Sequence, residues 1–120
     1  MPKNKLSQYK KQKFRLLIDS AFAKPEFFPK LKLKTNLAHC VHDLGLSPQT
    51  EDIEIYKNAI TSNRFVLTIN YRHFRKLVKP GKPGVFAIES ELSNKEIDET
   101  VTKFLSGKDP KDFIGKSVKI

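Results

Sequence analysis

The chain has 120 residues, of which 23 are lysine or arginine and 13 are aspartate or glutamate, giving a formal net charge of +10. This length fits one domain with one hydrophobic core, and the single cysteine, Cys40, excludes an internal disulfide and a cysteine-rich zinc module. No apolar run approaches the roughly 20 residues that cross a bilayer, and the basic N-terminus lacks the apolar segment of a secretion signal. We therefore expect a cytoplasmic domain with a polyanionic partner and no membrane association.

The positive charge is concentrated in two parts of the sequence. Residues 1–35 carry ten basic and two acidic side chains, and residues 64–82 carry six basic and no acidic ones. Between them, residues 36–63 carry one basic and four acidic side chains. Segregated basic segments favour a phosphate-backbone partner, so nucleic acid is the expected ligand. A charged surface that serves only solubility is the plainer alternative.

The first half of the chain predicts two strands and two helices after a basic arm, residues 1–12, that is either frayed or a short helix. In order they are a buried strand over 14–18, a short helix over 29–34, a strand over 37–41, and a helix with Thr50 as its N-cap that ends at Ser62 and Asn63. The alternation within 30–34 also suits a strand. By helical spacing, the inward face of the longer helix is formed by Ile53, Tyr56, Ala59 and Ile60.

The second half continues this alternation of strands and helices. It predicts a strand over 65–69, a basic helix over 71–78, turns over 79–84, a strand over 85–88, a helix from a Ser93–Glu96 capping box to Gly107, and an edge strand over 117–120. Such alternation indicates an α/β fold. We expect a single three-layer domain, residues 13–120, with a mainly parallel central sheet.

Four polar side chains are expected to meet at one edge of this sheet. Asp19 directly follows the first predicted strand, and Asn70 directly follows the third. Asp52 opens the helix between the second and third strands, and His73 lies one helical turn after Asn70. In an open parallel sheet the working site lies beyond the carboxyl ends of the strands, so these residues form the candidate constellation.

Carboxylate and amide oxygens of this kind suit Mg²⁺ or Mn²⁺, which can activate water for an in-line phosphodiester displacement. Each residue also has an ordinary alternative: Asp19 as a turn acid, Asp52 as a partner of the helix dipole, Asn70 as an N-cap and His73 as a surface histidine. Glu51 and Glu54 are expected to be solvated.

A second cluster, His39, Cys40 and His42, is not expected to bind metal. In a strand, His39 and His42 point to opposite faces, because successive side chains alternate. Cys40 and His42 would share a face, but two ligands do not make a zinc site.

Several short motifs, in this order and spacing, resemble those of a known family. They are Leu16-Leu17-Ile18-Asp19, His42-Asp43-Leu44-Gly45-Leu46, Asp52-Ile53-Glu54-Ile55, Arg64-Phe65-Val66-Leu67-Thr68 and the segment from Thr68 to Phe74, followed by Pro83-Gly84-Val85. Together they resemble small PIN-like domains, a group of metal-dependent ribonucleases that includes toxins of toxin–antitoxin pairs. The resemblance covers about residues 13–89.

The resemblance implies an endoribonuclease that hydrolyses RNA phosphodiester bonds with Mg²⁺ or Mn²⁺. Asp19 and Asp52 would hold the metal, and Asn70 and His73 would complete the catalytic site. The expected RNA-binding residues are Arg72, Arg75, Lys76, Lys79 and Lys82 together with Lys10, Lys11 and Lys13. An antitoxin protein or a second copy of the chain would be a further partner.

The chain departs from the family pattern at the positions that matter most for turnover. Ser20 follows Asp19 where the family often has glutamate, and Asn70 and His73 stand near two expected aspartates. Fewer charges weaken Mg²⁺ binding, although a histidine still suits Mn²⁺ or proton transfer. A catalytically impaired protein that binds RNA or an antitoxin is therefore a second hypothesis, and a structural subunit is a third.

Overall fold

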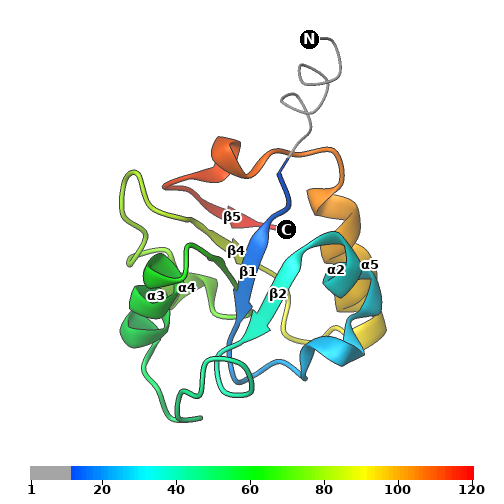
Figure 1. Ribbon diagram of the computed structural model, residues 1–120, viewed down its shortest axis with the longest axis horizontal. Coiled ribbons are helices and arrows are strands. Elements are labelled where there is room, and N and C mark those ends of the chain that lie inside the picture. Colours follow the sequence, from blue (N-terminus) through cyan, green and yellow to red (C-terminus); the bar gives the residue numbers. More distant parts are fainter. Residues whose placement is uncertain (1–11) are drawn as a thin grey trace, which may run out of the picture.

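The computed structural model describes residues 12–120, which form a five-stranded, all-parallel sheet between helices (Figure 1). The strands are β1 (Arg15–Ile18), β2 (Asn36–His39), β3 (Phe65–Thr68), β4 (Val85–Ala87) and β5 (Ser117–Lys119), in the order β2-β1-β3-β4-β5. The helices are η1 (Pro25–Phe27), α2 (Pro29–Lys34), α3 (Asp52–Thr61), α4 (Tyr71–Phe74), α5 (Asn94–Leu105) and η2 (Pro110–Phe113). The predicted α/β class with a parallel central sheet is confirmed, while most of the predicted arm lies outside the described residues.

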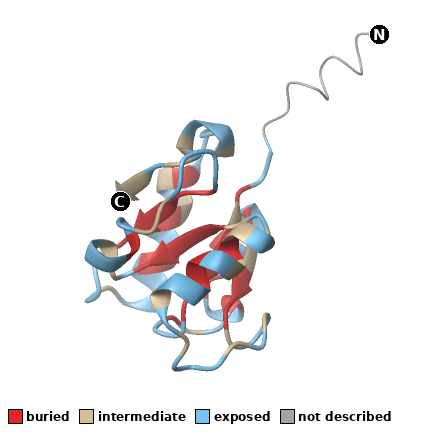
Figure 2. Ribbon diagram, turned by 90° about the vertical axis from the view of Figure 1, so that its left-hand side faces the viewer, coloured by how far each residue is buried: buried red, intermediate tan, exposed pale blue. Residues whose placement is uncertain are grey.

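The sheet buries both of its faces, as the uninterrupted apolar runs predict. Leu16, Ile18 and Leu67 pack in the core on the side of α2 and α5, whereas Leu17 and Val66 pack on the side of α3 and α4. Figure 1 shows these two helix pairs on opposite sides of the sheet, and Figure 2 shows the central strands buried and the edge strand β5 only half-buried. All five of these residues have an exposed fraction of 0%.

Two predicted boundaries are wrong at the second strand and at the short basic helix. β2 ends at His39 rather than at residue 41, because His39 O accepts hydrogen bonds from the backbone N–H groups of Asp43 and Leu44 and the chain turns there. α4 is one turn long and ends at Phe74 rather than at residue 78. The chain continues as turns in which Leu77 N–H donates to Phe74 O.

The start and inward face of α3 also differ from the sequence prediction. Its N-cap is Glu51, whose side chain makes no capping bond, and the Thr50 hydroxyl instead donates to Ser47 O at 2.6 Å. Ile55 is buried in the core, whereas Ile53 is 46% exposed. The helix is therefore rotated relative to the predicted face, because Ile55 and Tyr56 rather than Ile53 meet the sheet.

Asp98 is a buried carboxylate that sequence reasoning did not single out. It lies on α5, and its two oxygens accept hydrogen bonds from the backbone N–H groups of Lys30 at 3.1 Å and Leu31 at 2.8 Å. These are among the unsatisfied donors of the first turn of α2, where a negative charge is also favoured. Asp98 therefore fixes α2 against α5 and has a structural explanation.

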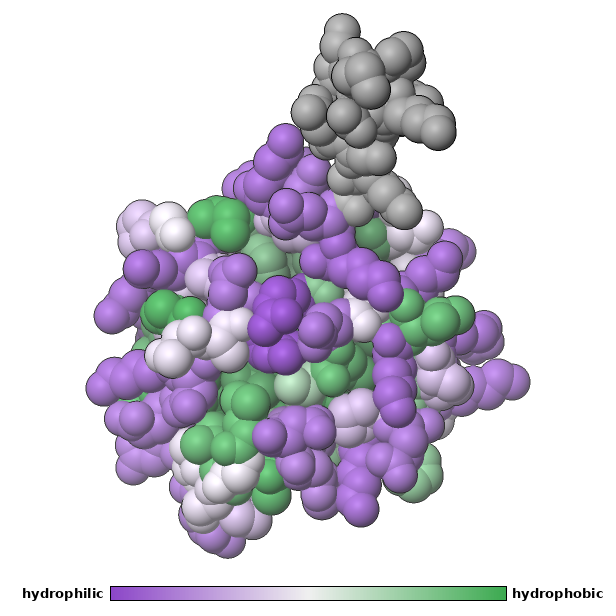
Figure 3. All heavy atoms as spheres, viewed as in Figure 1, coloured by the Kyte–Doolittle hydropathy of each residue, from purple (hydrophilic) through white to green (hydrophobic). Residues whose placement is uncertain are grey.

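The face of the molecule shown in Figure 3 is mainly polar. Hydrophilic side chains predominate on it, and apolar atoms are visible between them. Of the residues that the structure describes, none belongs to a helix with both the length and the apolar composition of a transmembrane segment.

Candidate functional site

Asp19 lies at the carboxyl end of β1, one residue beyond Ile18, as predicted. It is buried, with an exposed fraction of 7%. Its Oδ1 accepts a hydrogen bond from the Ala21 backbone N–H at 3.0 Å, and its Oδ2 accepts one from the Thr68 hydroxyl at 3.1 Å. Within residues 12–120, no lysine or arginine forms an ion pair with it. The position therefore holds a carboxylate without a lysine or arginine partner.

Asp52, Asn70 and His73 lie together at this edge, as predicted, and form a hydrogen-bonded cluster. Asn70 Nδ2 donates to Asp52 Oδ2 at 3.1 Å and lies 3.0 Å from His73 Nδ1. Because an amide nitrogen only donates, its two hydrogens serve both partners, and a neutral His73 ring carries its proton on Nε2. His73 Nδ1 also lies 3.5 Å from Asp52 Oδ2, so a protonated ring would pair directly with that carboxylate.

Thr68 connects Asp19 to this cluster and was missed by sequence reasoning. Its hydroxyl donates to Asp19 and accepts a hydrogen bond from the Asn70 backbone N–H at 2.9 Å. Thr68 is the fully buried last residue of β3, so a hydroxyl at the end of an apolar strand was the available signal. The Asn70 side chain makes no capping bond to α4, so it is committed to Asp52 and His73 rather than to the helix.

The two carboxylates line one open hollow of about 420 Å³ at the carboxyl edge of the sheet. Its lining residues are Asp19, Ser20, Ala21, Thr50, Asp52, Ile55, Ile69 and Asn70. Burial raises the pKa of Asp19 above its ordinary value of 3.8, and the nearby charge of Asp52 raises that pKa further. Hydrogen bonds from Ala21 and Thr68 act in the opposite direction, lowering the pKa. The hollow therefore concentrates negative charge in a protein whose net charge is strongly positive.

We expect Asp19→Asn to stabilise the folded protein near neutral pH. Because the folded-state pKa is raised above 3.8, the charged carboxylate is disfavoured in the fold, and this penalty develops as the pH rises from 3.8 through the folded pKa. Thermal unfolding should show a higher Tm for the variant at pH 7 and a shrinking difference as the pH falls toward 4. The exposed Asp112→Asn serves as the control, and an Asp19→Asn variant with a lower Tm at pH 7 would contradict the interpretation.

Asp19 and Asp52 are the side chains of this site that could hold a divalent cation. Asp19 and Asp52 offer carboxylate oxygens without a lysine or arginine partner, and Mg²⁺ is commonly held by one or two carboxylates plus waters and substrate phosphate. Among the described residues, no group of three or more histidine, cysteine, aspartate or glutamate side chains is placed so that it could hold a metal ion. Water and substrate would therefore supply the remaining ligands.

The other acidic and metal-like candidates lie outside this cluster. Glu54 pairs with Lys57 at 3.4 Å on the exposed side of α3, and Glu51 is exposed. The prediction that His39 and His42 face apart is wrong, because the turn after β2 brings their ring centroids within 4.6 Å. His39 Nε2 is hydrogen-bonded to Phe22 O, and its Nδ1 accepts from the backbone N–H groups of Val41 and His42. The His39 ring is therefore fully engaged.

The predicted RNA-binding residues are divided between two edges of the sheet. Arg72 and Arg75 line a hollow that also includes Asn70, and Lys76 lines one that also includes Asp52 and His73. These three basic side chains therefore surround the candidate site.

Lys79, Lys82 and Lys13 lie toward the amino ends of the strands. Lys82 O accepts a hydrogen bond from Gly115 N–H shortly before β5, and Lys13 lies two residues ahead of β1. The three lysines are therefore separated from the candidate site by the length of the strands, whereas Lys10 and Lys11 lie outside the described residues.

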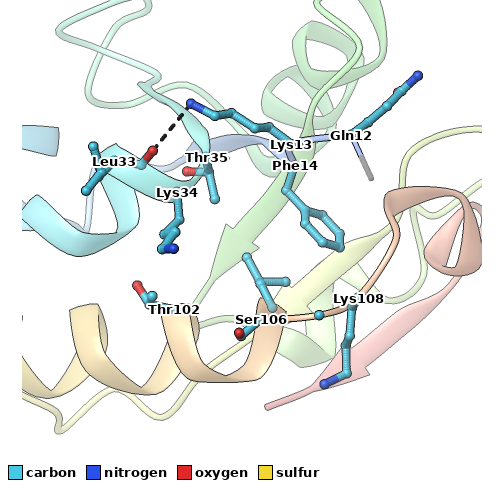
Figure 4. Close-up of a pocket in the computed structure, with 11 residues that line it drawn as sticks. Gln12, Lys13, Phe14, Leu33, Lys34, Thr35, Thr102, Ser106 and Lys108 are labelled. Carbon is cyan, nitrogen blue, oxygen red and sulfur yellow. Dashed lines mark hydrogen bonds between the residues drawn. The ribbon is translucent and has the colours of Figure 1, made fainter. Parts of the chain in front are cut away.

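A second hollow, of about 470 Å³, lies at this amino edge between β1, α2 and the end of α5 (Figure 4). Lys13, Lys34 and Lys108 line it, and no carboxylate does. Lys13 Nζ donates to Leu33 O at 3.4 Å, and Lys108 Nζ donates to Phe104 O at 2.6 Å. These lysines therefore complement the carbonyl groups at helix ends, where cations are favoured.

Comparison of the chain with protein-family models, curated proteins and solved structures finds no match. The chemistry of the site consequently rests on its own geometry. That geometry consists of two carboxylates at the end of a buried parallel sheet, an amide and an imidazole beside them, and exposed arginine and lysine side chains around the same hollow.

Proposed function

We propose that this protein is a metal-dependent endoribonuclease of the PIN-like kind that hydrolyses RNA phosphodiester bonds. The observation that carries the proposal is the convergence of Asp19 and Asp52 on one hollow at the carboxyl edge of the sheet, with neither carboxylate paired to lysine or arginine. The raised pKa of Asp19, caused by burial and then by Asp52, is typical of functional carboxylates. The motif order from Asp19 to Phe74 favours the same activity.

Asp19 and Asp52 would hold Mg²⁺ or Mn²⁺, which when bound supplies a more acidic water and neutralises charge on the phosphodiester. The protein's own contribution is orientation. Thr68 fixes Asp19 Oδ2, and the Asn70 amide fixes Asp52 Oδ2 and the His73 ring. With Nδ1 engaged by the amide, His73 presents Nε2–H as a donor for a phosphate oxygen. Arg72, Arg75 and Lys76 would hold the flanking negative charge.

The test is an RNA cleavage assay with purified full-length protein, an RNA substrate and either Mg²⁺, Mn²⁺ or EDTA. Cleavage that requires the cation and is lost in Asp19→Asn would support the proposal. Equal cleavage by wild type and Asp19→Asn would overturn it, as would cleavage that EDTA leaves unchanged.

A catalytically impaired RNA-binding protein is the second candidate, and one observation favours it. Asn70 stands beside Asp52 and contributes an amide, and its side chain nitrogen is already committed to Asp52 and His73. The position therefore adds no negative charge for a cation.

Asn70→Asp separates these two candidates. If the natural protein is impaired for want of a third carboxylate, we expect this variant to gain Mg²⁺-stimulated cleavage from a wild type that shows none, because a third acid strengthens cation binding. The measurement is the cleavage rate as a function of Mg²⁺ concentration. A variant that remains inactive at all Mg²⁺ concentrations would argue against a merely degenerate site. Asn94→Asp, at an exposed position in the first turn of α5, controls for added charge.

A further inference from the structure

A hollow of about 440 Å³ adjoins the acidic one on the side of β5. Its lining residues are Ile69, Asn70, Tyr71, Arg72, Arg75 and Lys119. Ile69 and Asn70 line both hollows, so the two are continuous across the end of β3. We call the hollow of about 440 Å³, lined by Tyr71, the Tyr71 groove. Lys119 enters it from the last strand of the chain, which sequence reasoning had treated only as an edge strand.

Two of these cations lie over the ring of Tyr71. Lys119 Nζ lies 4.9 Å from the centroid of the Tyr71 ring, and Arg75 Cζ lies 6.0 Å from it. Cations at such distances are attracted to the aromatic ring, which leaves their charge available to a second partner. The ring therefore links α4 to β5 and gathers positive charge beside the candidate site.

The three cations of the groove form no ion pair within the described part of the protein, although Glu89 lines a neighbouring hollow that includes Tyr71 and Lys119. Arg72, Arg75 and Lys119 are exposed, no carboxylate lines the groove, and none of the three forms an ion pair within residues 12–120. Elsewhere on the surface, by contrast, Lys30 pairs with Glu99 and Lys57 pairs with Glu54. An unpaired cluster of two guanidinium groups and an ammonium group suits phosphate oxygens.

On its other side, the acidic hollow adjoins a third hollow with a different balance of charged side chains. That third hollow is lined by Glu51, Asp52, Ile53, His73, Lys76 and Leu77. Its single lysine is accompanied by two acids, so this side offers a weaker field for a polyanion. Of the two hollows that adjoin the acidic one, the Tyr71 groove therefore has the greater excess of basic over acidic side chains.

We propose that the Tyr71 groove binds the phosphate backbone of RNA on one side of the bond to be cut, with Lys119 as a binding residue alongside Arg72 and Arg75. This inference deepens the proposed function and depends on it for the position of the cut, but binding in the groove is measurable without cleavage. Ile69, which is 36% exposed, forms an apolar boundary between the groove and the acidic hollow. A strand that follows the groove thus reaches Asn70 and the two carboxylates directly.

The experiment measures binding of fluorescein-labelled oligouridylate to the full chain in EDTA, by fluorescence polarisation, between about 50 and 200 mM KCl. For single strands, each phosphate contact contributes about 0.7 to the slope of log K against log salt concentration. Lys119→Gln is expected to reduce the slope by about 0.7, and Arg72→Gln/Arg75→Gln by about 1.4. Lys119→Arg should keep the wild-type slope, and Lys32→Gln, on the exposed side of α2, is the control for net charge.

The proposal that the Tyr71 groove binds RNA would be overturned if the Lys119→Gln slope equalled that of wild type. It would also be overturned if Lys32→Gln reduced the slope by as much as Lys119→Gln does. Binding to phosphatidylserine vesicles with no binding to oligouridylate would also overturn it. The proposed function is tested separately. If wild type never cleaves RNA but the binding slopes are as expected, the nuclease proposal is rejected and the groove proposal is supported. If cleavage is metal-dependent but all groove variants keep the wild-type salt slope and KM, the nuclease proposal is supported and the groove proposal is rejected.

Discussion

Asp19→Asn is expected to lower metal-dependent RNA cleavage by about 100-fold or more, while leaving RNA binding in EDTA unchanged. Losing even a residue that only supports a metal ligand typically costs about 10–100-fold, so loss of a ligand charge should cost at least as much. The amide keeps the shape of the side chain and an acceptor for the Ala21 N–H, which lies 3.0 Å from Oδ1. The change therefore removes the charge and keeps the Ala21 contact, whereas the Thr68 hydroxyl, 3.1 Å from Oδ2, loses its acceptor there.

Two measurements make this expectation specific to catalysis. Oligouridylate binding in EDTA should match wild type, because Asp19 lines the acidic hollow and not the Tyr71 groove. Asp112→Asn, an exposed acid on η2, should cleave at the wild-type rate. A variant that loses cleavage, gains thermal stability at pH 7 and keeps RNA affinity would identify Asp19 as a carboxylate retained for chemistry. Loss of cleavage together with a lower Tm would instead point to misfolding.

Local signals predict the fold where neighbouring residues decide the structure. The capping box of α5 is an example: Ser93 Oγ accepts from Glu96 N–H at 3.1 Å, and Glu96 Oε1 accepts from Ser93 N–H at 2.9 Å. α2 likewise has its predicted bounds, with proline in its first turn. The predicted inward face of α3 was wrong because both Ile53 and Ile55 are apolar, and only packing against the sheet decides that Ile55 is the buried one.

The candidate site could be located from the sequence, but its connections could not. A parallel sheet brings the ends of β1 and β3 to one edge, which is why Asp19 and Asn70 could be predicted as neighbours. The bridge through Thr68 and the use of the Asn70 amide for Asp52 depend on side-chain geometry. Residues 64–82 form one basic segment of the sequence, but the fold divides their side chains between the two edges of the sheet.

The second large effect is expected for stability: Phe86→Ala should lower the free energy of unfolding by about 3–5 kcal/mol. Phe86 is 1% exposed and lies at the centre of an aromatic cluster. Its ring centroid is 5.4 Å from that of Phe65, 5.7 Å from Phe14, 5.9 Å from Phe104 and 5.3 Å from Phe113. Removing the ring leaves a cavity and takes away these contacts, and in a domain of this size Tm should fall by about 10–20 °C.

The position of the cluster predicts that this loss leaves the chemistry intact. Phe14, Phe65 and Phe113 lie at or ahead of the amino ends of strands, whereas Asp19 and Asn70 follow carboxyl ends. Below its Tm, Phe86→Ala should therefore keep the wild-type slope of RNA affinity against salt and the wild-type cleavage rate per folded molecule. Phe86→Leu, which refills part of the cavity, should lose less stability than Phe86→Ala. If Phe86→Ala changed the salt slope while still fully folded, the aromatic core and the Tyr71 groove would have to be coupled through β4, the strand that carries Phe86 and pairs with β3 and β5.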